Sequence, residues 1–523
     1  MQASNRYSPG EAAQLDRWNP MVSRTSPIEI AIVFHIQNVD TLPPALEAPI
    51  SAEAFQRVHG VSGELIQRTA DWLVGSGFKV IDRDHVTVWA RGTFDSVARA
   101  LHIDFEETYR HGQRKFRPTA EPTLPDWLAP WVLGVIGLDN VGELHPKHRR
   151  STRSDQLANG GQGFFPADLV SAYNVPSGLD GSGVTIGVLE FSNGYRAADL
   201  NMFWSTFGIA APSVTFVSVD GTPNDGGVSA VDLECTLDLE WAGAMAPGAD
   251  LVVYEAAAGS SDRSFGLSVL RSLRYVLQDQ QHQPSVLSIS YGDGESRFAP
   301  VTMQAWDNAM LELAARGVTV FVASGDEGAY GLHGMGRPIR HVDAPANCPH
   351  AVAVGGTHLV LNAEGVIGEE TGWTDTNNNG ASGGGLSQIF GVPSYQRAIA
   401  LPVSAETGAG RGVPDVALNA DPDTGYAVVF QGATTVVGGT SVASPIWAAF
   451  SALLQESRRR AGKGQLLCLH HHLYQLGEAP SYHDITVGNN NYYGVVGYHC
   501  TPGWDAVTGL GSVDVSAWIA ALS

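Results

Sequence analysis

The chain has 523 residues, of which 44% are hydrophobic and 16% are charged, so it is long enough for two or more globular domains. Its formal net charge is −22, and residues 156–523 carry 14 Lys and Arg against 34 Asp and Glu. This acidity argues against nucleic acid as a partner, because phosphate binding needs cationic side chains. It suits a protein that works at low pH, although solubility alone explains it equally well.

The first 150 residues predict a compact α+β unit. Residues 28–36 form an apolar run typical of a buried strand, and residues 85–93 alternate as a strand does. Helical spacing of apolar residues follows Ser51 up to residue 75 and begins again at Thr93, with Ser and Thr as expected N-caps. Strands and helices alternate until residues 132–141, where the unit ends.

Residues 145–163 have the composition of a linker, because they are basic at first, then small and polar, with no periodicity. Two roles are open for this stretch. It is either a plain flexible tether or the place where a peptidase is cut.

The remaining chain predicts a parallel sheet with helices on both faces. Short apolar runs alternate with helical segments such as residues 302–317, which is the pattern of buried parallel strands. These runs are residues 183–191, 250–256, 285–292, 317–325 and 350–357. Since active sites of such sheets lie beyond the carboxyl ends of the strands, residues at that edge are candidates for chemistry.

No apolar run approaches the length of a membrane span, and the first 30 residues contain no apolar core of a signal peptide. The four cysteines, Cys235, Cys348, Cys468 and Cys500, show no CxxC spacing. The absence of this spacing argues against a zinc site. The sequence leaves open whether the four cysteines form one or two disulfides.

The segment GGTSVASP, residues 438–445, predicts a nucleophilic serine. Ser441 would open a long helix, where nearby N–H groups favour negative charge. The alternative is an ordinary helix cap. A subtilisin-type serine needs a histidine base, but the chain has no His-Gly-Thr segment, so a different group has to accept the proton.

Two carboxylates are the better candidates for a base. Glu234 and Asp238 are four residues apart, so they share one helix face, and no Lys or Arg occurs between Arg196 and Arg263. Carboxyls held close together share a proton, which separates their pKa values. Asp326 follows a predicted strand, and a protonated Asp there can donate to a developing oxyanion. The alternatives are an exposed acidic helix face and a turn aspartate.

Taken together, these segments resemble the sedolisin family of serine-carboxyl peptidases, also called kumamolisin-like. The resemblance rests on GTSxxxP at 439–445, ExxxD followed by AGAMAPGA at 234–249, and the strand that ends in Gly325-Asp326. It covers nearly the whole chain. It implies a subtilisin-like α/β parallel sheet preceded by a smaller, ferredoxin-like α+β prodomain.

The resemblance also implies the roles of residues. Ser441 would be the nucleophile, Glu234 the base, Asp238 its partner and Asp326 the oxyanion donor. It further implies an extended carboxyl network and a substrate cleft made by Glu190, Ser290, Tyr291, Gly292, Asp343, Gly383, Gly384 and Gly385.

One Ca²⁺ ion is implied near the C-terminus, since hard Ca²⁺ prefers oxygen ligands. Asp484 and Asp505 would give carboxylates, and Ile485, Thr501 and Gly503 would give carbonyls. The family usually has Gly at the position of Thr501, which makes this residue the least secure ligand of the set.

The expected organisation is an activation prodomain at 1–150, a processing linker at 151–163 and a peptidase domain at 164–523. The implied protein is a monomeric, secreted zymogen that cleaves peptides in acid and is inhibited by its own prodomain, with no nucleic acid or membrane partner. Two rivals are a His-dependent alkaline peptidase and a non-catalytic binding protein that kept the fold.

Overall fold

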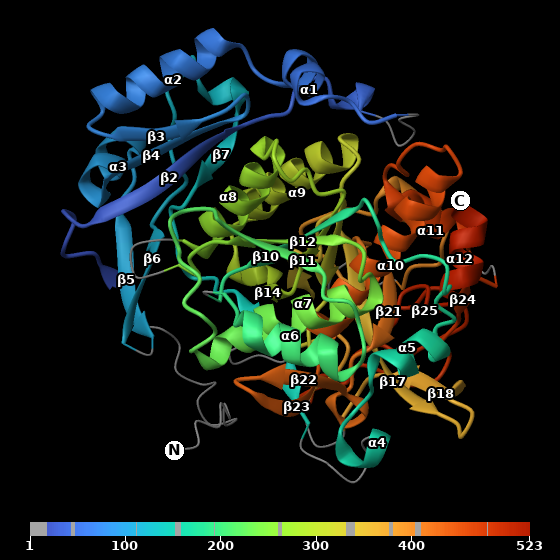
Figure 1. The fold of residues 1–523 in the computed structure, drawn as a ribbon. Coiled ribbons are helices and arrows are strands. Elements are labelled where there is room, and N and C mark those ends of the chain that lie inside the picture. Colours follow the sequence, from blue (N-terminus) through green and yellow to red (C-terminus); the bar gives the residue numbers. More distant parts are fainter. Residues whose placement is uncertain are drawn as a thin grey trace.

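In the computed structural model of the chain, the described residues are 18–523 except 43–47, 111, 152–157, 193, 260–263, 331–339, 376–379, 403–408 and 478–479. They form a smaller N-terminal unit and a larger unit, and the linker connects the two (Figure 1). Part of the expected processing linker, residues 152–157, lies outside the described residues.

The N-terminal unit is a four-stranded antiparallel sheet covered by helices on one face. The spatial order of its strands is β3 (Lys79–Arg83), β4 (Thr87–Thr93), β2 (Pro27–Phe34) and β7 (Val132–Ile136). Its helices are α1 (Ala52–His59), α2 (Gly63–Gly75) and α3 (Phe94–Leu101). Strand, helix, two strands, helix and strand in this order make the ferredoxin-like fold that was predicted. A small sheet beside it contains β1 (Asn19–Pro20), β5 (Phe105–Arg110) and β6 (Gln113–Pro118).

Local sequence sets the helix starts in this unit. The side chains of Ser51, Ser62 and Thr93 accept hydrogen bonds from backbone N–H groups of the first turns of α1, α2 and α3. The helix predicted over residues 51–75 is therefore two helices, because Gly60 ends α1 and Ser62 caps α2.

The larger unit is built on parallel strands whose carboxyl ends share one edge. Their spatial order is β11 (Ser213–Ser218), β12 (Asp250–Glu255), β10 (Thr185–Glu190), β13 (Val286–Ile289), β15 (Thr319–Ala323) and β17 (Val352–Leu361), followed by β21 (Val416–Asn419), which also pairs with β17. One strand, β18 (Ile367–Gly372), runs antiparallel to β17. The predicted parallel sheet is confirmed.

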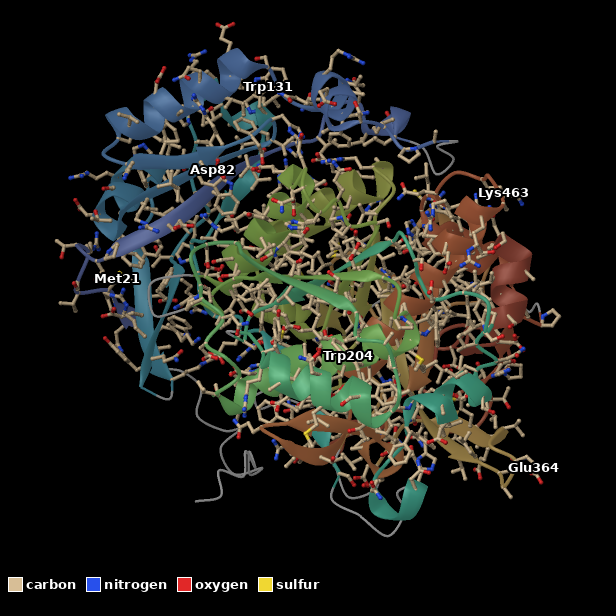
Figure 2. The ribbon with its side chains drawn as sticks, in the orientation of Figure 1. Met21, Asp82, Trp131, Trp204, Glu364 and Lys463 are labelled. Carbon is tan, nitrogen blue, oxygen red and sulfur yellow. The ribbon has the colours of Figure 1, made fainter. Side chains whose placement is uncertain are left out.

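Helices cover both faces of this sheet, as predicted. On one face lie α6 (Ala197–Thr206), α7 (Leu233–Met245), α10 (Thr440–Arg460) and α12 (Val515–Leu522), and on the other lie α8 (Phe265–Gln278) and α9 (Pro300–Ala315). Every residue of α7 is buried. Trp204 of α6 belongs to the packed interior that surrounds α7 (Figure 2).

Shorter elements complete the linker and the larger unit. They are α4 (Ala158–Gly161), α5 (Pro166–Ala172), α11 (Leu469–Leu476), β8 (His145–Pro146), β9 (Arg149–Arg150), β14 (Tyr291–Gly294), β16 (Asp343–Ala344), β19 (Gly385–Leu386), β20 (Gly412–Val413), β22 (Tyr426–Phe430), β23 (Ala433–Gly438), β24 (Tyr482–His483) and β25 (Ser512–Val513). All four cysteines are free thiols, so neither of the disulfides left open by the sequence is present among them.

The two units share a hydrophobic core. The second face of the N-terminal sheet packs on α8 and α9 (Figure 1), and Val33 and Ile136 belong to the same buried cluster as Leu267 and Met303. Apolar burial of this kind is the main force that holds the units together. The docking also fixes the point at which the linker leaves the N-terminal unit.

Candidate active site

Ser441 lies in the first turn of α10, directly after strand β23. The N-cap of the helix, Gly439, has φ 111°, a conformation that L side chains rarely adopt, so glycine is required at this turn. Ser441 is buried, and its Oγ donates a hydrogen bond of 3.2 Å to the carbonyl oxygen of Ser290.

Helix α7 brings two carboxyl groups to the same place. Asp238 Oδ2 accepts a hydrogen bond of 2.7 Å from Ser290 Oγ, and the carboxyl of Glu234 lies close enough to the Ser441 hydroxyl for that hydroxyl to affect its pKa. Both carboxyls are buried, so the exposed acidic helix face considered from the sequence is excluded.

Burial decides the protonation of these carboxyls. Desolvation raises the pKa of Glu234 well above its ordinary value, and Asp326 adds to this, although hydrogen bonds from Ser441 and Ser290 and the charge of Lys147 oppose it. Desolvation followed by the neighbouring Glu234 raises the pKa of Asp238 as well. Both groups therefore keep their protons to a higher pH than ordinary carboxyls do.

A third carboxyl, Glu190 at the end of β10, extends this network. Its Oε2 accepts a hydrogen bond of 2.9 Å from the hydroxyl of Tyr291. Desolvation and then the nearby charge of Asp238 raise its pKa. The resemblance implies that Glu190 extends the catalytic carboxyl network as well as lining the cleft, and its burial near Asp238 agrees with the first of these roles.

Asp326 lies three residues beyond strand β15 and faces the start of α10. Its Oδ1 accepts hydrogen bonds from the N–H of Thr440 at 2.8 Å and from the hydroxyl of Thr440 at 2.9 Å. Its Oδ2 is buried without a hydrogen bond to the described residues and lies 3.8 Å from Arg149 Nε. Burial raises the pKa of Asp326 to about 6, although Arg149 and Lys147 oppose this. The group is thus a proton donor in mild acid.

The linker passes directly through this cluster. Strand β8 pairs antiparallel with β14, so that Pro146 lies opposite Tyr291 and His145 opposite Gly292. Strand β9 pairs with β23, which leads into Ser441. The backbone N–H of Lys147 donates to the Ser290 carbonyl at 3.0 Å, and the backbone N–H of Ser441 donates to the Lys147 carbonyl at 2.8 Å.

The side chains of the linker also contact the site. Lys147 Nζ forms an ion pair of 2.7 Å with Asp343 Oδ2, and Arg149 forms one of 2.9 Å with Glu327. Nδ1 of His148 hydrogen-bonds to Glu234 Oε2. The sequence of this basic run is consistent with a tether or a cut site, and it does not predict that the run lies in the cleft.

Among the predicted cleft residues, Ser290, Tyr291, Gly292 and Asp343 contact the linker, whereas the three glycines do not pair with its described residues. The N–H of Gly383 donates to Gly325 at 2.7 Å, and Gly385 pairs with Val413. A side chain at Gly383 or Gly384 would collide with backbone carbonyls of Ser324 or Ala506. These glycines permit close backbone packing behind the strand that carries Asp326.

The residues predicted to bind calcium come from two neighbouring segments, residues 484–485 directly after β24 and residues 501–505. Asp484 Oδ2 accepts a hydrogen bond of 3.0 Å from the N–H of Gly503, and Asp505 Oδ2 accepts one of 3.1 Å from the N–H of Thr501. Burial raises the pKa of Asp505 to about 6, so a nearby cation would stabilise its ionised form. A buried carboxylate and an exposed one, both on the segments whose carbonyls are candidates, fit a calcium site.

Comparison with known proteins agrees with this geometry. Residues 21–141 match the family model described as pro-kumamolisin, activation domain, and residues 221–466 match that of the subtilase family. Kumamolisin of Bacillus sp. (strain MN-32) is 38% identical over 493 residues, covering 91% of this chain and 86% of that protein. The chain belongs to the kumamolisin and sedolisin family. It is a serine-carboxyl peptidase with an activation domain.

Other members of the family are similar over much of the chain. Tripeptidyl-peptidase 1 of Rattus norvegicus is 31% identical and covers 94% of this chain and 92% of its own. The solved structure of Pseudomonas sedolisin complexed with two molecules of pseudo-iodotyrostatin superposes with a TM-score of 0.59 at 28% identity, covering 69% of this chain and 97% of that one. These similarities to peptidases argue against the alternative of a non-catalytic binding protein that kept the fold. Among the described residues, no helix is long and apolar enough to cross a membrane.

Several residues of the site lacked a clear signal in the sequence. Lys147, His148 and Arg149 lay in a stretch of linker composition, and Glu327 lay in a turn. Only the density of basic residues beside an acidic domain could have suggested that this stretch docks into a negatively charged cleft.

Proposed function

We propose that Ser441, Glu234, Asp238 and Asp326 carry out acid-acting peptide hydrolysis in this serine-carboxyl peptidase. The observation that supports this most strongly is that Ser441, Asp326 and Glu234 all meet the same stretch of chain, Lys147 and His148. The N–H of Ser441 donates to the Lys147 carbonyl, whose oxygen borders the same space at Gly439 as Asp326 Oδ2, and Glu234 bonds to His148.

In the first step, Ser441 Oγ attacks the carbonyl carbon of the substrate while Glu234 takes the hydroxyl proton. Asp238 holds part of the carboxyl network in place through Ser290. The developing oxyanion receives hydrogen bonds from the N–H of Ser441 and from protonated Asp326. Glu234 then gives its proton to the leaving amine, and water hydrolyses the acyl-enzyme.

Carboxyl groups suit this chemistry in acid. An imidazole base would be charged there and unable to accept the proton, whereas carboxyls with raised pKa values exchange protons below neutrality. Asp326 has to be protonated to donate, so activity requires a pH near or below about 6.

The N-terminal unit acts as an intramolecular inhibitor in this proposal. Its linker fills the cleft, pairs with β14 and engages Glu234 through His148, so another peptide cannot enter. We propose the three parts that the sequence predicts, an activation prodomain at 1–150, a processing linker at 151–163 and a peptidase domain at 164–523. The residues that occupy the cleft, 145–150, are then the last segment of the prodomain.

Asp484, Asp505 and the carbonyls of Ile485, Thr501 and Gly503 would hold one Ca²⁺ ion. The bound ion would supply positive charge that ties β24 to the loop that precedes α12, a structural role remote from the chemistry. The hydrogen bonds that Asp484 and Asp505 already accept from this loop support the assignment.

The proposed substrates are peptides and unfolded proteins, bound as an extra strand against β14. We further propose a monomeric enzyme that works outside the cell, because an acid requirement fits an acidified surrounding medium rather than a neutral cytoplasm.

The test compares the wild-type full chain with Ser441→Ala on a peptide substrate from pH 3 to 8. We expect hydrolysis by wild type in acid and a loss of at least about 10³-fold in the variant. Equal hydrolysis by both proteins would overturn the proposed nucleophile. A wild-type optimum above neutral pH would overturn the carboxyl mechanism.

A further inference from the structure

We propose that the chain cuts its own Lys147–His148 peptide bond, and that it does so within one molecule. This inference rests on the proposed function, because it uses the same Ser441 chemistry. It adds the bond, the register and the residue that selects it.

The backbone hydrogen bonds fix which residue faces the nucleophile. The Lys147 carbonyl accepts from the N–H of Ser441 at 2.8 Å, while the Lys147 N–H donates to Ser290 at 3.0 Å. The residue that makes both contacts presents its carbonyl carbon to Ser441. The hydroxyl of Ser441 is also bonded to the Ser290 carbonyl, at 3.2 Å, which holds it next to that residue.

Space around the carbonyl is equally specific. A side chain at position 439 would collide with the Lys147 carbonyl oxygen and would touch Asp326 Oδ2. These two oxygens therefore border the same small space, and Gly439 leaves it open. An oxyanion formed at Lys147 would lie between the N–H of Ser441 and the carboxyl of Asp326.

The side chain of Lys147 favours this register of the chain over a register shifted by one residue. Lys147 is buried, and its ammonium lies 2.7 Å from Asp343 Oδ2. Burial alone would lower the pKa of this ammonium, but Asp343 and Glu327 outweigh it and raise the pKa. A shift by one residue would place Pro146 in this position. Proline has no charged side chain to pair with Asp343 and no backbone N–H to donate to the Ser290 carbonyl.

The chain is held on both sides of the bond. Upstream, β8 pairs with β14; downstream, β9 pairs with β23, and Arg149 bonds to Glu327 at 2.9 Å. The residues before β8 are docked too, since Glu143 pairs with Lys115 and its N–H donates to Asp293 at 3.2 Å. The Lys147–His148 bond thus lies at the Ser441 of its own molecule, and none of these contacts has to break before cleavage.

The step balances as ordinary hydrolysis. Ser441 Oγ forms a bond to the Lys147 carbonyl carbon, and its proton goes to Glu234. The bond from this carbon to the His148 nitrogen then breaks, and Glu234 returns the proton to the new amine. Water splits the ester, which leaves a carboxylate on Lys147 and restores the Ser441 hydroxyl. The contact between His148 and Glu234 places the leaving residue beside its proton donor.

The first test is to hold the purified full chain at neutral pH, shift it to pH 4, and sequence the N-terminus of the first large fragment. We expect His-Arg-Arg, starting at His148, and a half-time that does not change over a hundredfold range of protein concentration. A different first N-terminus would overturn the assigned bond. A rate proportional to protein concentration would overturn cleavage within one molecule.

Charge variants test the selecting residue. Lys147→Glu should slow formation of this N-terminus at least about 30-fold, because it sets two carboxylates against each other. Lys147→Arg, the matched control, should stay within about threefold. The exchange Lys147→Glu with Asp343→Lys should restore a large part of the rate. Unchanged cleavage at this bond in Lys147→Glu would overturn the role of Asp343.

An added peptide separates this inference from the proposed function. The peptide ELHPKHRRST, residues 143–152, is supplied to the same acidified wild-type samples, with Ser441→Ala as the inactive control. If the peptide is hydrolysed while the chain is first cut elsewhere, the function stands and the bond assignment fails. If neither the chain nor the peptide is cut, the proposed function itself fails.

Discussion

At the scale of single residues, Asp326 shows how one carboxyl serves both structure and chemistry. Its Oδ1 is occupied by the N–H and hydroxyl of Thr440, while Oδ2 faces the space beside the Lys147 carbonyl. Burial raises its pKa to about 6, against the charges of Arg149 and Lys147. Because burial is the largest cause of this shift, Asp326 keeps its proton in mild acid only while its carboxyl stays shielded from solvent.

This setting leads to a prediction for Asp326→Asn. An amide donates at every pH, so the variant should no longer lose activity as the pH rises through about 6, whereas wild type should. Asp326→Ala, which has no donor, should lose about 10²–10³-fold in kcat. The measurement is kcat against pH for the three processed enzymes. The same decline above pH 6 in wild type and Asp326→Asn would contradict the proposed donor.

Glu190 yields a prediction about stability. Its pKa is raised well above the ordinary 4.5 by burial and then by Asp238, so the folded state binds its proton more tightly than the unfolded state does. The stability it contributes is complete below pH 4.5 and is lost as the pH rises toward the raised pKa. Glu190→Gln should therefore flatten the fall of Tm between pH 4 and 8.

The comparison uses calorimetry in a Ser441→Ala background, which prevents processing. Glu364→Gln, an exposed surface change, is the control and should keep the wild-type slope of Tm against pH. An identical slope in Glu190→Gln and wild type would show that Glu190 is not a major part of the buried proton-binding network.

At the scale of elements, the site depends on three segments that end at one edge of the sheet. Helix α7 is buried along its full length, so its two carboxyls cannot turn to solvent. The first turn of α10 supplies Ser441, and the segment after β15 supplies Asp326. Because the strands between them are parallel and in register, small loops are enough to bring these groups together.

The loop that follows β24 leads to a calcium prediction. Asp484→Ala should abolish the rise in Tm that Ca²⁺ produces, since it removes one of two carboxylate ligands. For wild type the ion should add about 2.7 kcal/mol at 100 times its Kd. Tm is measured with Ca²⁺ and with a chelator, and Glu364→Ala is the control. A full wild-type response in Asp484→Ala would mean that the ligands are wrongly assigned.

At the scale of the whole molecule, a buried ion cluster fastens the activation domain to the peptidase. Arg274 of α8 bonds to Asp84 at 2.8 Å and to Glu312 at 2.5 Å, and His85 lies 3.2 Å from Glu312. Burial would raise the pKa of Glu312, but Arg274 and His85 outweigh it and hold the pKa at about 2. Glu312 contributes stability above pH 4.5 that is lost only as the pH falls toward 2. Mild acid therefore leaves this ion pair charged and intact.

Arg274→Met tests this fastening. The change leaves Asp84 and Glu312 without their cation, and loss of one partner of a buried ion pair costs about 3–5 kcal/mol. In the Ser441→Ala background, we expect an earlier unfolding transition by calorimetry. Arg99→Met, which removes an exposed ion pair within the activation domain, should leave that transition in place. Equal transitions in the two variants would mean that apolar packing alone holds the units together.

The sequence by itself determined the class of sheet, the order of its elements and the four catalytic candidates. Apolar periodicity and helix caps are local properties, and Ser441, Glu234, Asp238 and Asp326 each occur in a short segment with a distinctive pattern. Local pattern failed where a helix was split at Gly60, because the sequence shows continuous helical spacing across that residue.

Only the tertiary structure decided what the linker does. Its basic residues have no periodicity, so their sequence is equally consistent with a tether in solvent. Their conformation comes from contacts with residues more than 80 positions away: Glu234, Ser290, Asp343 and Ser441. Long-range pairing of this kind is set by packing and complementary charge across the two docked units. For that reason, Lys147 is identified as the residue at the nucleophile only once the chain is folded.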